Sequence, residues 1–240
     1  MTGQTVCAVY LARLSQLRPR HDSLLSGPEA QRAARYRLQP DRDRFVLATA
    51  LLRIVAACQT GGDPAELEVN RSCERCGAQH GRPRLPGTGL AASISHSGDV
   101  VAVALTAGLP VGVDVEAISA RDYEPLVARV CTAAERQFVR TAEDFYAYWT
   151  KKEAVLKATG TGLRTPMTAV TVTPPGTAPV VEGVEPCRLA TISAGAGYAA
   201  AVAVLTASPV TFDVSDADLA GRDGLPDVPA AGQATWPGGS

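Results

Sequence analysis

Hydrophobic residues in the first half of the chain follow two different spacings. Val6–Leu11 alternates as a strand would, whereas from Asp41 apolar residues recur at helical spacing as far as Gly61-Gly62, a predicted C-terminal cap. Gly27-Pro28-Glu29 predicts the start of a basic helix that runs to about Leu38. We expect strands at 67–71, 91–95, 100–106 and 111–115.

Two connections in this half carry their own signals. Residues 72–89 are rich in Gly, Pro and Cys and are expected to form a loop. The turn Ala107-Gly108-Leu109-Pro110 predicts a hairpin between the strands on either side of it.

The second half repeats the order of a helix followed by strands. Thr132-Ala133-Ala134-Glu135 is a capping box, and 143–159 predicts a longer helix that ends at Gly160. Short strands are expected at 170–172, 180–182, 187–192 and 198–205. The repetition predicts an α+β protein of two pseudo-twofold-related halves, each a helix packed on a small antiparallel sheet.

Composition changes after Ser208 and sets the predicted boundaries. Aspartate, glycine, proline and alanine dominate from there, so we expect a flexible acidic tail at 209–240, in which Trp236 is incidental. The N-terminal half is then 1–108 and the C-terminal half 109–208.

Charge and hydropathy narrow the class of protein. The chain has 240 residues and a formal net charge of −1, which argues against nucleic-acid binding through general basicity, so any phosphate site must be local. No apolar run is long enough to span a membrane, and the N-terminus lacks the layout of a signal peptide. We therefore expect a cytoplasmic enzyme or binding protein.

Cysteine spacing raises the question of a zinc site. Cys73, Cys76 and His80 have the spacing of a zinc knuckle, and Cys58 could supply a fourth ligand. Two reduced thiols capping a loop, or an adventitious disulfide in the purified protein, are the alternative readings, because a structural zinc needs four ligands.

Acidic residues form the candidate catalytic chemistry. Alternation along a strand puts Asp114 and Glu116 on one face, and helical spacing puts Glu153 and Lys157 on one face. Three carboxylates suit Mg²⁺, which commonly bridges carboxylates and substrate phosphates. Taken singly, each pair also fits an ordinary solvated strand face or a surface ion pair.

Three ordered motifs together make a more specific pattern. Ser95-His96-Ser97, Gly112-Val113-Asp114-Val115-Glu116 and Trp149–Lys157 resemble the 4′-phosphopantetheinyl transferases, in particular the longer pseudo-dimeric type that serves carrier proteins of peptide and polyketide synthases. The resemblance extends from about Glu29 to Leu205. Basic residues that fit it lie upstream, at Arg32, Arg35, Arg44, Arg53 and the turn Gly81-Arg82-Pro83. Arg32 and Arg82 replace lysines of the family, and Glu29 stands where some relatives have lysine.

The resemblance implies a reaction and partners. The phosphopantetheine arm of coenzyme A would pass to a serine of an acyl or peptidyl carrier protein, as in secondary metabolite biosynthesis, with release of 3′,5′-ADP. The enzyme would be a monomer with its active site in the cleft between the halves. The sequence carries no short motif that specifies which carrier proteins are served.

The resemblance also implies roles for individual residues. Asp114, Glu116 and Glu153 would hold Mg²⁺, with Glu153 also accepting the serine proton, and Lys157 would face the leaving phosphate. The expected ligands of the coenzyme A phosphates are Ser95, His96, Arg32, Arg44, Arg82 and Lys157.

Alternatives remain at the level of residues and of function. His96 alone would fit a hydrogen-bonded turn, and Arg44 would fit an ion-pair network with Asp41 on the helix surface. The same carboxylates could serve another Mg²⁺-dependent phosphotransferase or phosphohydrolase. A zinc-knuckle binding module with surface carboxylates is the non-enzymatic alternative.

Overall fold

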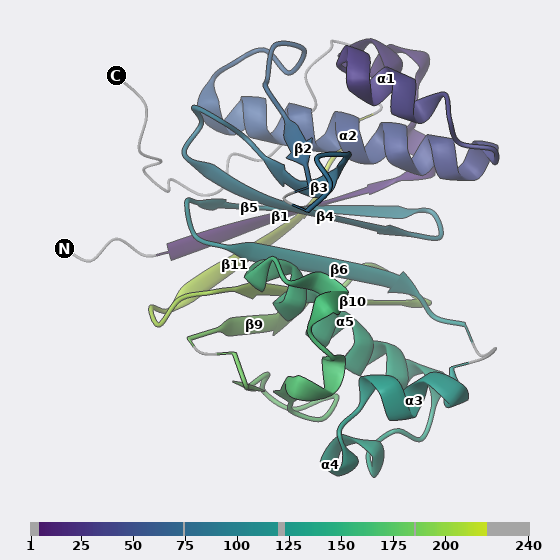
Figure 1. The fold of residues 1–240 in the computed structure, drawn as a ribbon, viewed down its shortest axis with the longest axis vertical. Coiled ribbons are helices and arrows are strands. Elements are labelled where there is room, and N and C mark those ends of the chain that lie inside the picture. The colour runs from purple at the N-terminus through teal and green to yellow at the C-terminus, as the bar shows by residue number, and fades with distance from the viewer. Residues whose placement is uncertain (1–4, 74, 120–122, 185, 220–240) are drawn as a thin grey trace.

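The computed structural model describes residues 5–73, 75–119, 123–184 and 186–219, and Figure 1 shows their arrangement. The helices are α1 (Gly27–Ala33), α2 (Gln39–Thr60), α3 (Glu124–Val130), α4 (Ala133–Arg136) and α5 (Ala142–Thr159), and 3-10 turns lie at Leu14–Gln16, Pro19–Leu24, Gly162–Arg164 and Met167–Ala169. The strands are β1 (Thr5–Arg13), β2 (Asn70–Ser72), β3 (Gln79–Arg84), β4 (Leu90–Ser97), β5 (Val100–Ala107), β6 (Val111–Ala117), β7 (Thr171–Val172), β8 (Val181–Glu182), β9 (Arg188–Thr191), β10 (Tyr198–Val204) and β11 (Val210–Asp216).

These strands form two principal sheets. The larger sheet has the order β11-β1-β5-β4-β3-β2, and its pairs are antiparallel except β1 with β11. The second sheet has the order β6-β10-β9 and is antiparallel. The strands β7 and β8 form a separate short ribbon.

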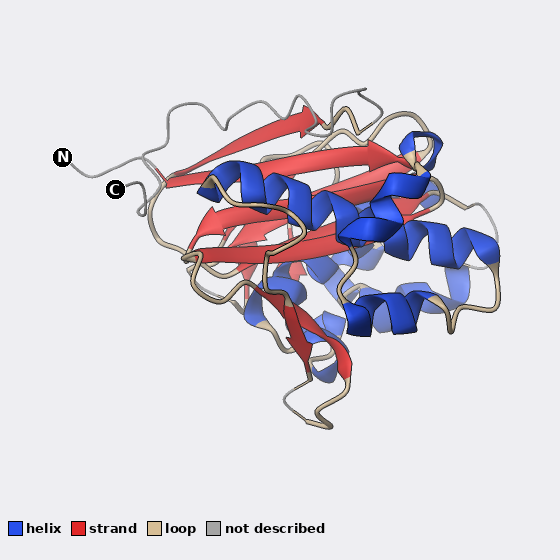
Figure 2. Cartoon of the chain, turned by 90° about the horizontal axis from the view of Figure 1, so that it is seen from above, coloured by secondary structure: helices blue, strands red, loops and turns tan. Residues whose placement is uncertain are grey.

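The sheets pack face to face between two long helices. Helix α2 covers the outer face of the larger sheet, and α5 covers the second sheet (Figures 1 and 2). An apolar core that includes Val9, Val113 and Val202, each fully buried, fills the space between the sheets. The layers are therefore helix, sheet, sheet and helix, which explains why β5 and the start of β6 are continuous apolar runs.

Both halves connect their elements in the same order. In the first, β1 precedes α2, and β4 and β5 follow it; in the second, β6 precedes α5, and β9 and β10 follow it. In each half the first strand pairs antiparallel with the last. The predicted α+β fold is confirmed, while the twofold relation between the halves stays a prediction.

Glycines end both long helices where the sequence predicts it. Gly61 follows α2 with φ 71°, and Gly160 follows α5 with φ 73°, the left-handed conformation that glycine adopts without strain. Thr141 caps the start of α5, since its hydroxyl accepts a hydrogen bond from the Asp144 backbone N–H.

The hairpin predicted at 107–110 is wrong. β5 pairs with β1 and β4, whereas β6 pairs with β10, so this turn carries the chain from one sheet to the other. The pairing in this region is instead a β4–β5 hairpin around Gly98-Asp99, with Gly98 at φ 57°. Two strands buried on both faces give no periodicity that identifies their neighbours.

The predicted flexible tail and loop also need correction. Residues 210–216 form β11 beside β1, and Ala217 and Leu219 are buried, so the tail prediction is wrong for this segment. Part of the predicted loop 72–89 is strand β3, which forms the hairpin with β2 that projects from the molecule in Figure 2. Residues 220–240, with Trp236, lie outside the described part.

The predicted basic helix ends early, since α1 stops at Ala33 rather than near Leu38. Among the described residues, no helix is both long and apolar enough to span a membrane.

Candidate active site

The second sequence motif and the last one meet where α5 crosses β6. Lys157 Nζ donates to Asp114 Oδ1 at 2.6 Å, to Ser95 Oγ at 2.9 Å and to the Val113 carbonyl at 3.0 Å. Ser95 Oγ donates in turn to Asp114 Oδ1 at 2.8 Å. Asp114 is 3% exposed, and its second oxygen, Oδ2, is buried without a hydrogen-bond partner. This unpartnered oxygen is a place for a ligand to bind, because buried carboxylate oxygens are normally satisfied.

Gly112 sets the distance between the helix and the strand. A Cβ at this position would lie 1.9 Å from the Ala154 carbonyl oxygen, 2.6 Å from the Ala158 nitrogen and 2.9 Å from Lys157 Cβ. Only glycine allows this approach of backbone to backbone. The close packing brings Lys157 over Asp114.

Glu116 is the next residue of β6 on the same face. Its Oε2 accepts a hydrogen bond from Ser97 Oγ at 2.7 Å. Burial raises the pKa of Glu116 and the charge of Asp114 raises it further, against the hydrogen bond from Ser97. The side chain of Trp149 lies beside this carboxylate and also acts to lower its pKa.

Glu153 on α5 belongs to the same electrostatic group. Burial raises its pKa first, and the charges of Asp114 and Glu116 act in the same direction, while Lys157 opposes them. The negative charges of Asp114 and Glu116 thus oppose ionisation of Glu153, which is what a cation bound among them would offset.

The three predicted metal ligands, Asp114, Glu116 and Glu153, offer the carboxylate oxygens that a hard divalent cation prefers, but their side chains are not gathered around one point. Among the residues that the structure describes, no group of three or more histidine, cysteine, aspartate or glutamate side chains is gathered as a metal site. The bare oxygen of Asp114 and the raised pKa values of Glu116 and Glu153 are nevertheless what a bound cation would relieve.

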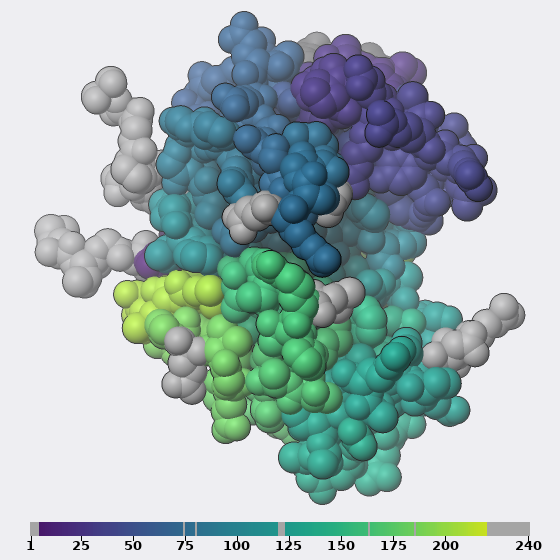
Figure 3. Space-filling model, viewed as in Figure 1, coloured from purple at the N-terminus to yellow at the C-terminus, as the bar shows by residue number. Residues whose placement is uncertain are grey.

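A cavity of about 460 Å³ opens beside this group, at the seam between the two halves. It is lined from the first half by α1, α2, β3 and β4 and from the second half by the end of α5. In Figure 3 the blue hairpin lies over this seam, against the green residues that follow α5. The predicted phosphate ligands that line it are Arg32, Arg82, Ser95, His96 and Lys157.

Arg71, on β2, lines the same cavity and was missed by the sequence reasoning. Its Nε and Nη2 are buried and have no hydrogen-bond partner, and burial lowers its pKa to about 10. It also lines a second cavity of about 210 Å³, together with Arg32 and Glu29. A buried guanidinium with bare nitrogens is an anion-binding group. The only sequence signal was an arginine inside a predicted strand.

Arg32 and Arg82 approach the cavity from different elements. Arg32 Nη1 donates to the Gln79 carbonyl at 2.6 Å, and its guanidinium lies over the ring of Phe45 at 5.0 Å. Arg82 Nη1 donates to the Ala158 carbonyl at 3.3 Å and so links β3 to α5 across the seam.

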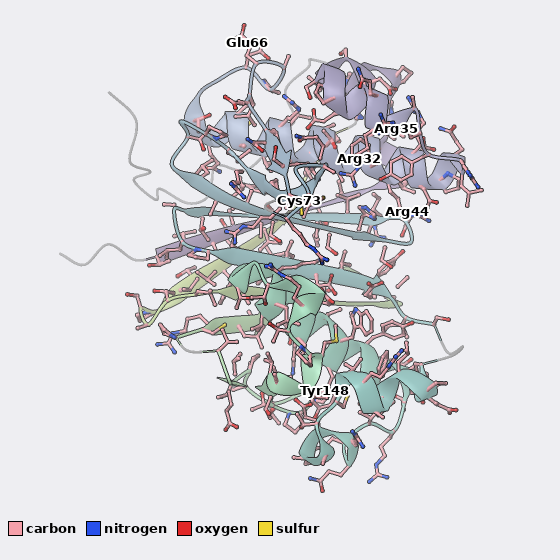
Figure 4. The ribbon with its side chains drawn as sticks, in the orientation of Figure 1. Arg32, Arg35, Arg44, Glu66, Cys73 and Tyr148 are labelled. Carbon is pink, nitrogen blue, oxygen red and sulfur yellow. The ribbon has the colours of Figure 1, made fainter. Side chains whose placement is uncertain are left out.

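Arg44 does not line this cavity. Its Nε donates to the Gly98 carbonyl at 2.7 Å, and its Nη1 lies 2.7 Å from Asp41 Oδ1. Figure 4 shows Arg44 beside the β4–β5 turn, apart from Arg32. Of the alternatives left by the sequence, these contacts favour the ion pair with Asp41. Arg53 has a structural role, since it is 1% exposed and pairs with Glu29.

His96 lies on β4 at the mouth of the cavity and is exposed. Partial removal of water lowers its pKa, and the positive charges of Lys157, Arg44 and Arg71 lower it further. Several cations around one imidazole indicate a region of positive potential that suits an anionic ligand.

The cysteine pair lies at the tip of the β2–β3 hairpin (Figure 4). Cys73 and Cys76 are not joined by a disulfide, and backbone N–H groups of Arg75 and Cys76 lower the pKa of Cys73. Cys58 is exposed, and the side chain of His80 lies outside the described part. The zinc site therefore stays a prediction.

Comparisons with known proteins converge on one family. A model of the 4′-phosphopantetheinyl transferase superfamily matches residues 110–203, which contain the Asp114, Glu116, Glu153 and Lys157 positions. The chain is 30% identical over 150 residues to 4′-phosphopantetheinyl transferase HetI of Nostoc sp., covering 58% of this chain and 61% of that protein. It is 26% identical over 190 residues to the 4′-phosphopantetheinyl transferase of Bacillus subtilis, covering 74% and 81% of the two chains.

A further relative has similar identity over a comparable span. The 4′-phosphopantetheinyl transferase AcpT of Salmonella typhi is 32% identical over 142 residues, covering 56% of this chain and 67% of that protein. The match spans about 61% of the length of the first of these relatives. Taken with the α+β fold and the carboxylate and lysine group on β6 and α5, these matches show that the chain belongs to the 4′-phosphopantetheinyl transferase superfamily.

Proposed function

We propose that the protein transfers the 4′-phosphopantetheinyl arm of coenzyme A to a serine hydroxyl of an acyl or peptidyl carrier protein, releasing 3′,5′-ADP. The observation that carries the proposal is the buried Asp114–Lys157 pair with its bare carboxylate oxygen, next to a cavity lined by cationic side chains. The model of the 4′-phosphopantetheinyl transferase superfamily matches residues 110–203, which include this pair.

Coenzyme A would bind across the seam between the halves. Arg32, Arg71 and Arg82 line the cavity and would bind its phosphates through charge-assisted hydrogen bonds, together with His96. A cavity of about 460 Å³ accommodates part of a nucleotide-sized ligand, and the pantetheine arm would extend outward to the carrier protein.

Asp114, Glu116 and Glu153 would hold Mg²⁺ beside the pyrophosphate. A bound Mg²⁺ would neutralise charge on the phosphoryl oxygens. Lys157, already paired with Asp114, would face the phosphate that leaves and offset its growing negative charge.

Glu153 would accept the proton of the carrier serine. The serine oxygen forms a bond to the β-phosphorus, the bond from that phosphorus to the bridging oxygen breaks, and 3′,5′-ADP leaves with the electron pair. Glu153 is the candidate for this role because it lies on α5, a different element from the strand β6 that carries Asp114 and Glu116.

The test is incubation of the protein with coenzyme A, Mg²⁺ and a panel of apo carrier proteins, followed by intact mass measurement. We expect a carrier to gain the mass of one phosphopantetheinyl group, and 3′,5′-ADP to appear in equal amount. Cleavage of coenzyme A without carrier modification would instead indicate a phosphohydrolase.

A variant pair tests the proton acceptor. Glu153→Gln should slow transfer by about 10²–10⁴ with coenzyme A still bound. Glu143→Gln changes an exposed glutamate in the first turn of the same helix and should transfer normally. If Glu153→Gln and Glu143→Gln transfer at equal rates at saturating Mg²⁺, Glu153 is not the proton acceptor.

We further propose that the enzyme acts as a cytoplasmic monomer, because both halves of the fold are present in one chain. Sedimentation as an obligate dimer would contradict this.

A further inference from the structure

The edge between the two sheets is joined by serine side chains. β4 pairs with β3 and β5 and β6 pairs with β10, so no backbone ladder connects β4 to β6. Alternation puts Ser93, Ser95 and Ser97 on one face of β4. Each of their hydroxyls forms a hydrogen bond with a backbone N–H or a carboxylate side chain of β6.

The Ser97 hydroxyl acts as both a hydrogen-bond donor and a hydrogen-bond acceptor at this edge. Its Oγ donates to Glu116 Oε2 at 2.7 Å and accepts the backbone N–H of Ala117 at 3.0 Å. A serine hydroxyl has a single proton, so the Ala117 contact leaves that proton for the carboxylate. One oxygen of Glu116 is thereby held in place by β4.

Ser95 differs from Ser97 in this respect. Ser95 accepts from Lys157 and lines the large cavity, so replacing it would disturb phosphate and cation contacts together. Within the described structure, the Ser97 hydroxyl does not line that cavity, and its hydrogen bonds go to Glu116 and Ala117 rather than to Lys157. Its effect on the reaction would pass through Glu116 alone.

The strand end that carries Ser97 is itself fixed. Arg44 Nε donates to the carbonyl of Gly98, and the backbone N–H of Asp99 donates to the Tyr198 hydroxyl at 3.0 Å. A Cβ on Gly98 would lie 2.4 Å from that hydroxyl oxygen. The turn after Ser97 is therefore held by both α2 and β10. The backbone that carries the Ser97 hydroxyl is thus fixed in position relative to Glu116.

We infer that Ser97 is a positioning residue that orients Glu116 toward the divalent cation. The inference rests on the proposed function, in which Glu116 is a cation ligand. Partners that orient metal ligands typically contribute about 10–100-fold in metal affinity or activity.

The test uses Mn²⁺ as the probe, with free Mn²⁺ followed by electron paramagnetic resonance. The full-length protein is titrated alone and with saturating coenzyme A, without carrier protein. Ser97→Ala should weaken Mn²⁺ binding about 10-fold or more. Ser97→Thr keeps the hydroxyl and should restore most of the affinity.

Thr88→Ala is the matched control. The Thr88 hydroxyl also accepts one backbone N–H, from Leu90, and donates once, to the Leu85 carbonyl, but it precedes the opposite end of β4. It should lose a similar degree of thermal stability and bind Mn²⁺ as the wild type does. In transfer assays, Ser97→Ala should need more Mg²⁺ for half-maximal rate, with an unchanged KM for coenzyme A.

Separate outcomes overturn the inference and the proposed function. A folded Ser97→Ala protein with wild-type Mn²⁺ affinity, or a loss that Ser97→Thr shares equally, would overturn the positioning role. Wild-type protein that binds no Mn²⁺ under either condition would overturn it as well. A wild type that modifies no carrier protein and binds no coenzyme A would instead reject the proposed function.

Discussion

Lys157 Nζ donates to Asp114 Oδ1 at 2.6 Å, so two motifs separated by 43 residues meet as one ion pair. The Asp114 side chain is 4% exposed and that of Lys157 is 27% exposed. The pair is thus buried on its acidic side and open to solvent on its basic side.

Lys157→Met should destabilise the protein because it leaves a buried carboxylate unpaired. Since Lys157 is partly solvated, we expect a loss of about 1–3 kcal/mol, below the ~3–5 of a fully buried pair. Asp114→Asn in the same chain should recover much of that loss but not activity. Urea unfolding of both single variants and the double variant measures the coupling, and strictly additive losses would contradict it.

Gly112→Ala should separate α5 from β6. The added Cβ meets backbone atoms, which cannot rotate away, so we expect a loss of at least ~1–3 kcal/mol and of most transfer activity. Gly62→Ala is the control, because its nearest contact is the Thr60 hydroxyl at 3.6 Å. Thermal melts of the two variants should differ clearly, and equal melts would refute the close contact.

Arg71→Ala should weaken coenzyme A binding more than Arg44→Ala does. Arg71 presents bare buried nitrogens to the cavities, whereas Arg44 is occupied by Gly98 and Asp41. Loss of a charge-assisted hydrogen bond of ~1.5–3 kcal/mol corresponds to about 10–100-fold in affinity. Calorimetry measures the affinity of both variants for coenzyme A. A larger loss of affinity for Arg44→Ala would show that Arg44, rather than Arg71, binds a phosphate.

Truncation after Ser208 should unfold or strongly destabilise the protein, whereas truncation after Leu219 should be tolerated better. The first removes β11 and the buried Ala217 and Leu219. It also exposes the edge of β1, which invites association between chains. Circular dichroism melts and light scattering on both forms check this, and identical behaviour would contradict it.

His21 should make stability depend on pH. It is 2% exposed, its Nδ1 accepts the Arg18 N–H at 3.1 Å, and burial lowers its pKa below the ordinary value of 6.5. The unfolded chain then binds more protons as pH falls below about 6.5, so stability is full above that pH and declines below it. His21→Gln should flatten the change in melting temperature between pH 7.5 and 5.5, and an unaltered slope would assign the effect to other groups.

Helix positions were predictable from the sequence because their signals are local. The glycine caps and the threonine capping boxes fix α2, α4 and α5 within a few residues. Strand pairing was harder, since alternation identifies a buried face and not the neighbouring strand. β11 was missed because Val210, Phe212 and Val214 alternate within a segment whose aspartates are typical of a flexible acidic tail.

The candidate site divides in the same way. Spacing within one strand and one helix predicted that Asp114 and Glu116, and Glu153 and Lys157, share faces. The contact between Lys157 and Asp114 depends on Gly112, whose importance only appears when two backbones pack together. Arg71 was missed because the cavity that it lines is formed by residues distant in sequence, and Ser97 because its hydrogen bond to Glu116 joins two strands of different sheets.

The place of β11 has a consequence for synthesis. Thr5 of β1 pairs with Val210, so the sheet begun by the first strand is completed by the last. A ribosome-bound chain must therefore keep one edge of β1 unpaired until residues 210–216 have been made. Until β11 pairs with it, we expect this exposed edge to make the first half a target for chaperones.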